Sequence, residues 1–351
     1  MDEPESAAVS TAPSVHVPDT GGPHSSSLVR QSPMSSTPSG ENLDRRTRRR
    51  GDAIFRMLAQ GSGAALLVIM AAIAVFLVLQ AVPALNADTT SFLTTLKWAP
   101  DGTPSSFGIA ALAFGSVLTS LLALLISVPV AVGVALATSH YAPRWLARPL
   151  AYVVDLLAAV PSVVFGLWGL TYLVPNIITP STFLNHYLGF IPLFASNGTY
   201  GKSIFAVSIV LAVMAIPIIS AISREVFIQT PRDQVEAAWA IGATKWEMVR
   251  TAILPYGRSG IISGTVLGFG RAIGETIAVA LVLSANYEIS LHILEPGGNT
   301  IAANIATRYG EAGEIGRGAL IASGLVLFII TLIVNFWARA IVGKNSRGGA
   351  S

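Results

Sequence analysis

Two side chains of opposite charge lie inside an apolar stretch of the chain, residues 260–284. Arg271 and Glu275 are four positions apart there, so one continuous helix would place both on the same face. A guanidinium can hold an oxyanion through two parallel hydrogen bonds. A carboxylate beside it can balance the charge of an empty site or accept a proton from a protonated oxyanion. The spacing therefore indicates an anion-binding element, and an ion pair that only fixes helix packing is the alternative.

Charges in such a stretch are energetically costly. Two charges at the centre of a membrane helix cost roughly 5–7 kcal/mol, and the large apolar residues of the stretch offset roughly 3–7 kcal/mol. The charged face must therefore turn toward protein or water. The pairs Gly264/Gly268 and Gly270/Gly274 predict close contact with neighbouring helices. Asp155 lies near the end of another apolar stretch, where contact with water or pairing with an arginine would account for its charge without a functional role.

A second segment, residues 230–255, carries the signals that begin and end short helices. Thr230 can cap a first helix whose initial position is the proline that follows. Gly242 suits the left-handed residue that ends this helix. Thr244 and Glu247 have the spacing of a capping box, which would open a second helix. The segment is therefore predicted to form two short helices joined at a glycine.

These two helices offer small residues next to large apolar ones. Ala237 and Ala238 would allow another backbone to approach closely, and Trp239, Ile241 and Trp246 are large apolar anchors. Aromatic anchors beside a rigid turn are typical of protein interfaces. The segment is therefore a candidate docking surface, and an amphipathic hairpin resting on the lipid surface is the alternative.

The composition indicates what kind of scaffold positions these groups. Of the 351 residues, 52% are apolar and 12% are charged, about half the charged share of soluble domains. Mean hydropathy is +0.62. The absence of cysteine excludes disulfides, thiolate metal sites and cysteine nucleophiles. The net charge of +3 is too small to indicate a basic domain that binds nucleic acid. The five histidines all fall in the tail or in loops, so no metal site is expected.

Apolar stretches long enough to cross a bilayer predict an all-α polytopic membrane protein with six transmembrane helices. They are residues 61–83, 108–138, 151–175, 203–223, 260–284 and 317–341. Pro161 and Pro217 interrupt the third and fourth stretches. When both tails and the loops near 139–150 and 224–259 share one side, that side holds 17 of the 22 Lys and Arg residues, including Arg339 at the end of the last stretch. The positive-inside rule then places both termini in the cytoplasm.

Two regions of different composition divide the chain. More than half of residues 1–40 are Ser, Pro, Thr or Gly, which predicts a disordered cytoplasmic tail over residues 1–50 that ends in an arginine-rich cluster. Residues 51–345 form the predicted six-helix transmembrane domain. Segment 230–255 lies on its predicted cytoplasmic face.

Segment 230–255 also resembles the EAA signature of ABC-importer permeases. The matching residues are Glu236-Ala237-Ala238, Gly242 and Leu254-Pro255, and the isoleucine position of the signature is Ala252, with Ile253 next to it. In that family the segment is a coupling helix that docks into a cleft of the ATPase subunit. The resemblance implies the fold of type I ABC importer permeases (MetI-like) and a coupling role for residues 235–247. The coupling residues would be Glu236, Ala237, Ala238, Trp239, Gly242 and Trp246.

Two further segments resemble the permeases of phosphate importers. Residues 270–276, Gly-Arg-Ala-Ile-Gly-Glu-Thr, are similar to the GRAxGET segment of these permeases, and residues 159–166 are similar to their IPSVVYG-like stretch. The resemblance implies that Arg271, Glu275 and Thr276 line the substrate pathway. The long tail and the sizeable outer loops favour the PstC type of permease over the PstA type.

The resemblance implies partners and a location as well. The chain would be the phosphate permease subunit of a bacterial plasma-membrane importer. It would not be an enzyme with its own ATPase site, since the segment Gly201-Lys202-Ser203 lacks the leading glycine of a nucleotide-binding loop. ATP and Mg²⁺ would bind to a cytoplasmic ATPase dimer (PstB-like). A second permease subunit (PstA-like) and an extracytoplasmic phosphate-binding protein would complete the assembly. A permease for sulfate, molybdate or another small solute is an alternative, as is a membrane enzyme or channel.

Overall fold

The computed structural model describes residues 50–347. The predicted tail and its arginine cluster therefore lie outside the described residues, apart from their last position. The chain divides into two compact units, one up to Gly63 and one from Ala64 onward. The described part of the first unit is the beginning of helix α1, and the following paragraphs concern the second unit.

Within the described residues the chain is almost entirely helical. The first half contains α1 (Arg50–Ala87), β1 (Trp98–Ala99), β2 (Ser106–Phe107), α2 (Ala110–Leu136), η2 (Ala137–Tyr141), α3 (Arg144–Ala159), α4 (Ser162–Trp168), η3 (Gly169–Leu173), α5 (Val174–Asn176), α6 (Ile178–Leu188) and η4 (Pro192–Phe194). The second half contains α7 (Ile204–Ile228), α8 (Arg232–Ala240), α9 (Lys245–Met248), η5 (Val249–Ile253), α10 (Leu254–Ile273), α11 (Ile277–Val282), α12 (Ile301–Arg308) and α13 (Glu314–Arg347). The sequence of elements confirms the all-α prediction.

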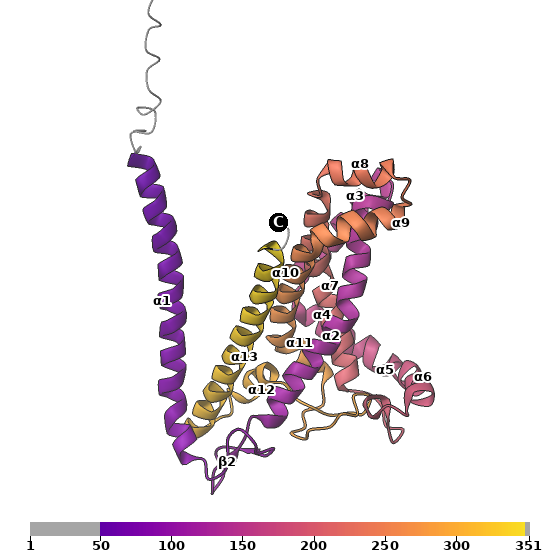
Figure 1. Ribbon diagram of the computed structural model, residues 1–351. Helices are drawn as coiled ribbons and strands as arrows, with labels where there is room; N and C mark the ends of the chain where they lie inside the picture. Colours follow the sequence, from indigo (N-terminus) through magenta and orange to yellow (C-terminus); the bar gives the residue numbers. More distant parts are fainter. Residues whose placement is uncertain (1–49, 348–351) are drawn as a thin grey trace, which may run out of the picture. The chain divides into compact units, whose positions relative to one another are not determined.

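Helix α7 is the centre of the bundle, and it packs mainly between α2 and α10 (Figure 1). Two thirds of its apolar window is buried, far more than in any other helix long enough to cross a membrane among the described residues. The contact with α2 uses small residues four positions apart, Ala123, Ser127, Ala131 and Ala135, all fully buried. Because small side chains let two backbones approach closely, α2 and α7 can pack without large apolar side chains between them.

Glycines on α10 make the matching contact on the other side of α7. A Cβ atom at Gly260 would lie 2.5 Å from Val226 Cγ2, and one at Gly264 would lie 3.2 Å from the Ile219 carbonyl oxygen. Gly268 also faces Ile219, so the predicted Gly264/Gly268 contact is confirmed. At Gly270/Gly274 no other helix of the described chain makes such a contact, since no neighbouring atom lies within 4 Å of a Cβ at Gly270.

Not all six predicted stretches are single straight helices. Four helices are long and apolar enough to cross a membrane, and α3 with α4 could form a fifth crossing that is bent by 95° at Val160 and Pro161. The prediction of one continuous span over residues 260–284 was wrong, because α10 ends at Ile273 and α11 begins at Ile277. Residues 50–347 thus contain four or five candidate spans by this measure, and the count of six stays a prediction.

Three helices widen into a π-turn two residues before a proline. The π-turns are η2, η3 and η5, which precede Pro143, Pro175 and Pro255. In each case the N–H just before the proline donates to the carbonyl five residues back, as from Leu254 to Val249. A proline has no N–H and its ring collides with the carbonyl four residues back. At η3 and η5 the wider turn makes room for that ring, and the helix continues through Pro175 and Pro255. At η2 the helix ends, because Ala142 before Pro143 is extended.

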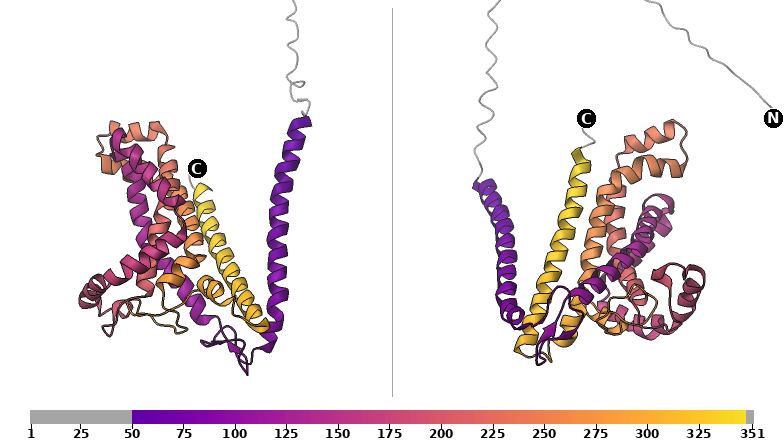
Figure 2. Two further views of the ribbon diagram at one scale, coloured as in Figure 1. Left: turned by 180° about the vertical axis from the view of Figure 1, so that it is seen from behind. Right: turned by 60° about the horizontal axis from the view of Figure 1, so that its bottom comes forward.

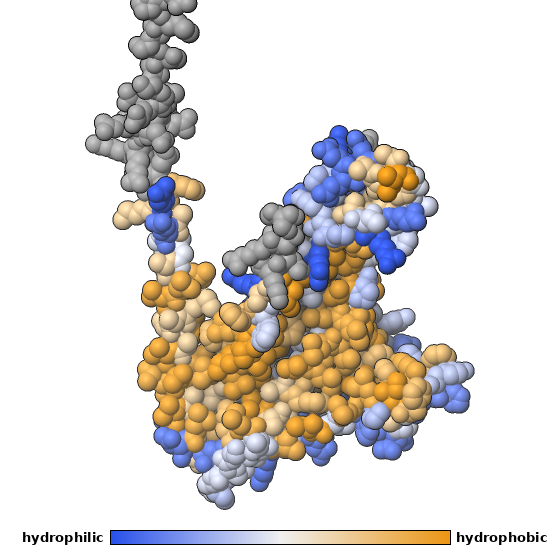
Figure 3. All heavy atoms as spheres, in the orientation of Figure 1, coloured by the Kyte–Doolittle hydropathy of each residue, from blue (hydrophilic) through white to orange (hydrophobic). Residues whose placement is uncertain are grey.

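The two ends of the second unit have different structures. Helices α8 and α9 form one end, whereas α6, α12 and the connecting loops form the other, and both further views show the same separation (Figures 1 and 2). Hydrophilic residues gather around α8 and α9 and along the opposite edge, with a broad hydrophobic surface between them (Figure 3). This distribution is the one expected for a protein that spans a bilayer.

Candidate functional site

The turn between α8 and α9 has the geometry of a Schellman motif. Gly242 has a φ of +82°, which favours glycine over any residue with a side chain. The Gly242 N–H donates to the Trp239 carbonyl at 2.9 Å, and the Ala243 N–H donates to the Ala238 carbonyl at 3.1 Å. These two bonds close the end of α8 and set the direction in which the chain leaves it. The prediction that Gly242 is the left-handed residue that ends the first helix is therefore confirmed.

The start of α9 is fixed by the predicted capping box. The Thr244 hydroxyl accepts from the Glu247 N–H at 3.3 Å, and Glu247 Oε2 accepts from the Thr244 N–H at 2.8 Å. The Thr244 hydroxyl also donates to the same carboxylate oxygen. These bonds lower the pKa of the Glu247 carboxyl below its ordinary value, because they favour the charged form. The turn is thus held from both sides by local hydrogen bonds.

The start of α8 differs from the prediction. The residue before its first turn is Pro231, which has no side-chain hydrogen bond to the helix, and the Thr230 hydroxyl is buried without a hydrogen-bonding partner. The prediction that Thr230 caps α8 was therefore wrong. Its side chain is turned into the protein, where it cannot reach the free N–H groups of the first turn.

One face of the hairpin is buried and the other is exposed. Ala238, Met248 and Val249 pack against Phe227 of α7 and Leu136 of α2 in one apolar cluster. This cluster attaches the hairpin to the bundle. Burial of these side chains also explains why α8 and α9 keep a fixed position although both are short.

The exposed face carries the predicted anchors. Ile241, Trp246 and Trp239 expose 86%, 56% and 50% of their surface. Glu236 and Ala237 are exposed as well. A cleft of about 780 Å³ lies between α8 and the chain that follows α9. Large apolar side chains that protrude from a rigid turn, with a cleft beside them, form a surface suited to a protein partner.

A single helical run connects this surface to the charged residues of the apolar stretch. From Lys245 the chain continues through α9, η5 and α10 to Ile273 without leaving a helical conformation. Helix α10 alone has 20 residues, which corresponds to about 30 Å. Arg271 lies in the last turn of α10, at the opposite end from the hairpin.

Arg271 and Glu275 do not form the expected pair. The helix is interrupted at residues 274–276, so the two residues do not share a face of one helix, and no ion pair joins them among the described side chains. Arg271 is partly buried, and its Nε has no hydrogen-bonding partner. The buried Glu275 carboxylate, 8% exposed, accepts from the Ala278 N–H in the first turn of α11 at 3.2 Å. Thr276 lies between the two helices and is partly buried.

This arrangement leaves a cationic donor without a partner among the described side chains, beside the break between α10 and α11. The C-terminal end of α10 favours a cation, and the N-terminal end of α11 favours an anion. Arg271 and Glu275 therefore each lie at the helix end that suits their charge. Because Arg271 is not neutralised by Glu275, its guanidinium is available to an external oxyanion.

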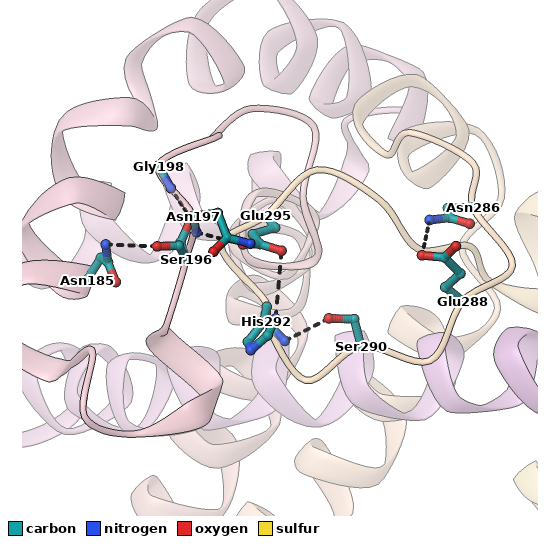
Figure 4. A network of polar contacts seen from close by, with 9 residues as sticks. All are labelled: Asn185, Ser196, Asn197, Gly198, Asn286, Glu288, Ser290, His292 and Glu295. Atoms are coloured by element: carbon teal, nitrogen blue, oxygen red, sulfur yellow. Dashed lines mark hydrogen bonds and ion pairs between the residues drawn. The ribbon is translucent and has the colours of Figure 1, made fainter.

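Other polar contacts complete the bundle. Asp155 of α3 is paired with Arg224 of α7 at 3.7 Å, which confirms the prediction of an arginine partner. The loops at the end opposite the hairpin are tied together around Glu295, which accepts from the Asn197 N–H at 2.8 Å and lies 3.7 Å from His292 (Figure 4). Local sequence patterns gave no sign of the Asn197–Glu295 contact, because its partners are about a hundred residues apart.

These features define a helical membrane protein with an exposed docking hairpin and an unpaired arginine at a helix break. Residues 127–347 match the family model described as binding-protein-dependent transport system inner membrane component. Because this match covers more than half of the chain, the protein belongs to the family of inner membrane components of binding-protein-dependent transport systems.

Curated relatives match over most of their length. The chain is 45% identical over 311 residues to phosphate transport system permease protein PstC 2 of Mycobacterium tuberculosis, covering 87% of this chain and 96% of the relative. It is 44% identical to PstC of Mycobacterium leprae, covering 86% and 96%, and 40% identical to PstC of Xylella fastidiosa, covering 89% and 96%. An inward-facing structure of the MetNI methionine ABC transporter aligns at 16% identity with a TM-score of 0.45, over 66% of this chain and 91% of that chain.

Proposed function

We propose that this chain is a permease subunit of an ATP-driven importer of inorganic phosphate. The proposal is supported by relatives named as phosphate transport system permeases, at 40% to 45% identity over most of both chains. The observation that carries the mechanism is the exposed hairpin at Gly242, which is continuous with the helix that bears Arg271. The chain would span the bacterial plasma membrane, with both termini and the hairpin in the cytoplasm.

In this proposal the hairpin couples the bundle to a cytoplasmic ATPase. Ile241, Trp239 and Trp246 enter a cleft of the ATPase, and closure of an ATPase dimer moves the hairpin. Because α9, η5 and α10 form one helical run, the movement reaches the last turn of α10. ATP and Mg²⁺ bind only to the ATPase, so this chain carries no cofactor. A dimer has two clefts and the described part of this chain has one such hairpin, so a second permease subunit completes the assembly. An extracytoplasmic binding protein delivers the phosphate.

The proposed substrate contact is made by the residues around the helix break. The Arg271 guanidinium holds two phosphate oxygens. The Glu275 carboxylate accepts a hydrogen bond from a protonated phosphate oxygen, and Thr276 lines the path beside it. Sulfate and molybdate carry no such proton at neutral pH, so Glu275 repels them. This role for Glu275 favours phosphate over the other oxyanions.

The transport role of these residues can be tested by substitution. We expect Arg271→Ala and Glu275→Gln to leave membrane insertion and complex assembly intact and to abolish phosphate uptake, because neither side chain pairs with another described side chain. Arg308→Gln is the matched control, since Arg308 is an exposed arginine outside the proposed path. Uptake of labelled phosphate is the measurement. Uptake at the wild-type rate by either pathway variant would show that the residue does not serve transport.

The coupling role can be tested by crosslinking. The chain has no cysteine, so Ile241→Cys introduces a single reactive thiol at the most exposed anchor of the hairpin. We expect this thiol to crosslink to an ATPase subunit. We expect a thiol from Phe190→Cys, two residues after α6 at the end of the bundle opposite the hairpin, not to do so. Phosphate, sulfate and molybdate should then be compared for stimulation of ATP hydrolysis in proteoliposomes. Stimulation by sulfate alone would assign a different substrate.

A further inference from the structure

A cavity lies between the end of α1 and the beginning of α13, at the end of the bundle opposite the hairpin. Its volume is about 640 Å³. The apolar part of its wall includes Phe76 and Pro83 of α1 and Ile321 of α13. Its polar side chains include Gln80 of α1 and Glu314 and Arg317 of α13. The cavity thus has one apolar side and one polar side.

The frame of this cavity is held by close contacts that do not use its polar side chains. A Cβ atom at Gly318 would lie 2.7 Å from Ala84 Cβ, so α1 and α13 are in backbone contact there. The Asp101 carboxylate, in the loop between β1 and β2, accepts from the Gly313 N–H at 2.9 Å and from the Gly316 N–H at 2.8 Å. These bonds satisfy the free N–H groups at the start of α13. The cavity is therefore preformed, and its polar groups are available to a ligand.

The charged groups in the cavity have no ionic partner among the described side chains. The two ion pairs among the described side chains lie elsewhere, at Arg224–Asp155 and at His292–Glu295. Arg317 and Glu314 are three residues apart on α13 but do not pair. The Arg317 guanidinium lies over the Tyr309 ring, 5.9 Å from its centroid, which orients it without neutralising its charge. The cavity thus offers one cation and one anion, side by side.

The position of the cavity suits a lipid. It lies in the last turns of one membrane helix and the first turns of another, where the hydrophobic surface meets the hydrophilic edge (Figure 3). In its apolar window only 6% of α1 is buried, and in that of α13 only 22%. Lipid chains therefore have access to the apolar side of the cavity, and its polar side lies at the depth of the headgroups.

We propose that this cavity binds the headgroup of a zwitterionic phospholipid of the phosphatidylethanolamine type. The phosphodiester accepts hydrogen bonds from the Arg317 guanidinium. The primary ammonium donates to the Glu314 carboxylate and to the Gln80 amide oxygen. The first carbons of the acyl chains contact Phe76 and Ile321. Phosphatidylglycerol offers the same phosphodiester to Arg317, but it has a neutral glycerol hydroxyl in place of the ammonium, so Glu314 gains no cationic partner.

The test measures lipid retained by the purified, full-length chain. The protein is stripped of lipid in detergent, titrated with phosphatidylethanolamine or phosphatidylglycerol, and examined by native mass spectrometry. We expect one tightly bound phosphatidylethanolamine per chain. Arg317→Gln should weaken its binding about tenfold, the size expected for loss of a charge-assisted hydrogen bond. Arg308→Gln, which removes an exposed arginine of α12 outside the cavity, should bind as the wild type does.

A further variant and a competition measurement identify the ligand. Glu314→Gln should reduce the preference for phosphatidylethanolamine over phosphatidylglycerol. Inorganic phosphate in large excess should not displace the bound lipid. Displacement by phosphate would show that the site holds a free anion, and equal lipid binding by wild type and Arg317→Gln would show that the cavity is not a headgroup site. Either result overturns the proposal. Because the assay measures binding without transport, the proposed function can fail or hold independently of it.

Discussion

At the scale of single residues, the capping box at the start of α9 determines how the docking hairpin is held. Thr244 and Glu247 bond reciprocally, and folding lowers the pKa of the Glu247 carboxyl. A carboxylate whose pKa is lowered on folding stabilises the folded form above the pKa of the unfolded chain. That contribution is lost as the pH falls through the lowered pKa. The hairpin should therefore be fully capped at neutral pH and loosen only in acid.

We expect Thr244→Ala to loosen the turn between α8 and α9. Because the substitution removes the hydroxyl that accepts from the Glu247 N–H, amides 244–248 should exchange with solvent about fivefold faster at neutral pH, as for the loss of a typical N-cap. Hydrogen exchange read by mass spectrometry measures this. The difference in exchange rate between the wild type and Thr244→Ala should become smaller in acid, as Glu247 is protonated.

Thr251→Ala provides the control. Its hydroxyl donates to the Glu247 carbonyl within the helix at 2.7 Å and caps nothing. Exchange of amides 244–248 should therefore stay at the wild-type rate. Equal exchange in Thr244→Ala and wild type would contradict a stabilising role for the capping box.

Residues whose roles depend on neighbours in the chain could be predicted, and residues whose partners lie far away could not. Gly242 and the Thr244–Glu247 pair act within a few residues, so spacing alone identified them. Asp101 caps α13 from more than two hundred residues away, and no local pattern contains that information. The apolar pattern runs through the break at Gly274, so the sequence predicts one helix face for Arg271 and Glu275 where the structure has two separate helices.

At the scale of elements, the contact between α7 and α10 depends on glycines that let the two backbones meet. We expect Gly264→Leu to separate the helices, because a side chain there meets the Ile219 backbone, which cannot rotate away. Overpacking of this kind costs about 1–3 kcal/mol or more. Thermal unfolding of the purified protein in detergent should show a lower midpoint and a lower yield of folded protein.

Gly270→Leu is the matched variant on the same helix. It makes the same change of residue, but no neighbouring atom lies within 4 Å of a Cβ at position 270. Leucine also has a higher helix propensity than glycine. The thermal unfolding midpoint of Gly270→Leu should therefore equal or exceed that of the wild type. If both variants melt at the same temperature, the glycine contact is not what holds α10 against α7.

Prolines show why helix ends were harder to predict than helices. Pro161 and Pro217 interrupt apolar stretches in the same way, but the chain bends sharply at Pro161, whereas α7 continues through Pro217. Helix α7 is packed between α2 and α10, and that packing keeps it in one piece across its proline. Such differences come from tertiary packing, which overrides local preference.

At the scale of the whole molecule, the absence of cysteine allows a direct test of orientation. We expect a thiol from Phe190→Cys to react with a membrane-impermeant maleimide in intact cells, and a thiol from Ile241→Cys to react only after permeabilisation. Both positions are highly exposed, and the wild type gives no background. The proposed cytoplasmic position of the hairpin rests on the distribution of Lys and Arg. The reverse pattern of labelling would invert the proposed topology.

The glycines of α10 have a consequence for how the protein is made. Helix α10 is not among the four described helices apolar enough to cross a membrane individually, because glycines and two arginines occupy much of its length. A nascent segment of this kind has little tendency to leave the translocon for lipid on its own. Helix α7 precedes it by one short hairpin and presents the matching surface. We expect α7 to be retained at the translocon until α10 has been synthesised, so that the two helices enter the bilayer as a pair.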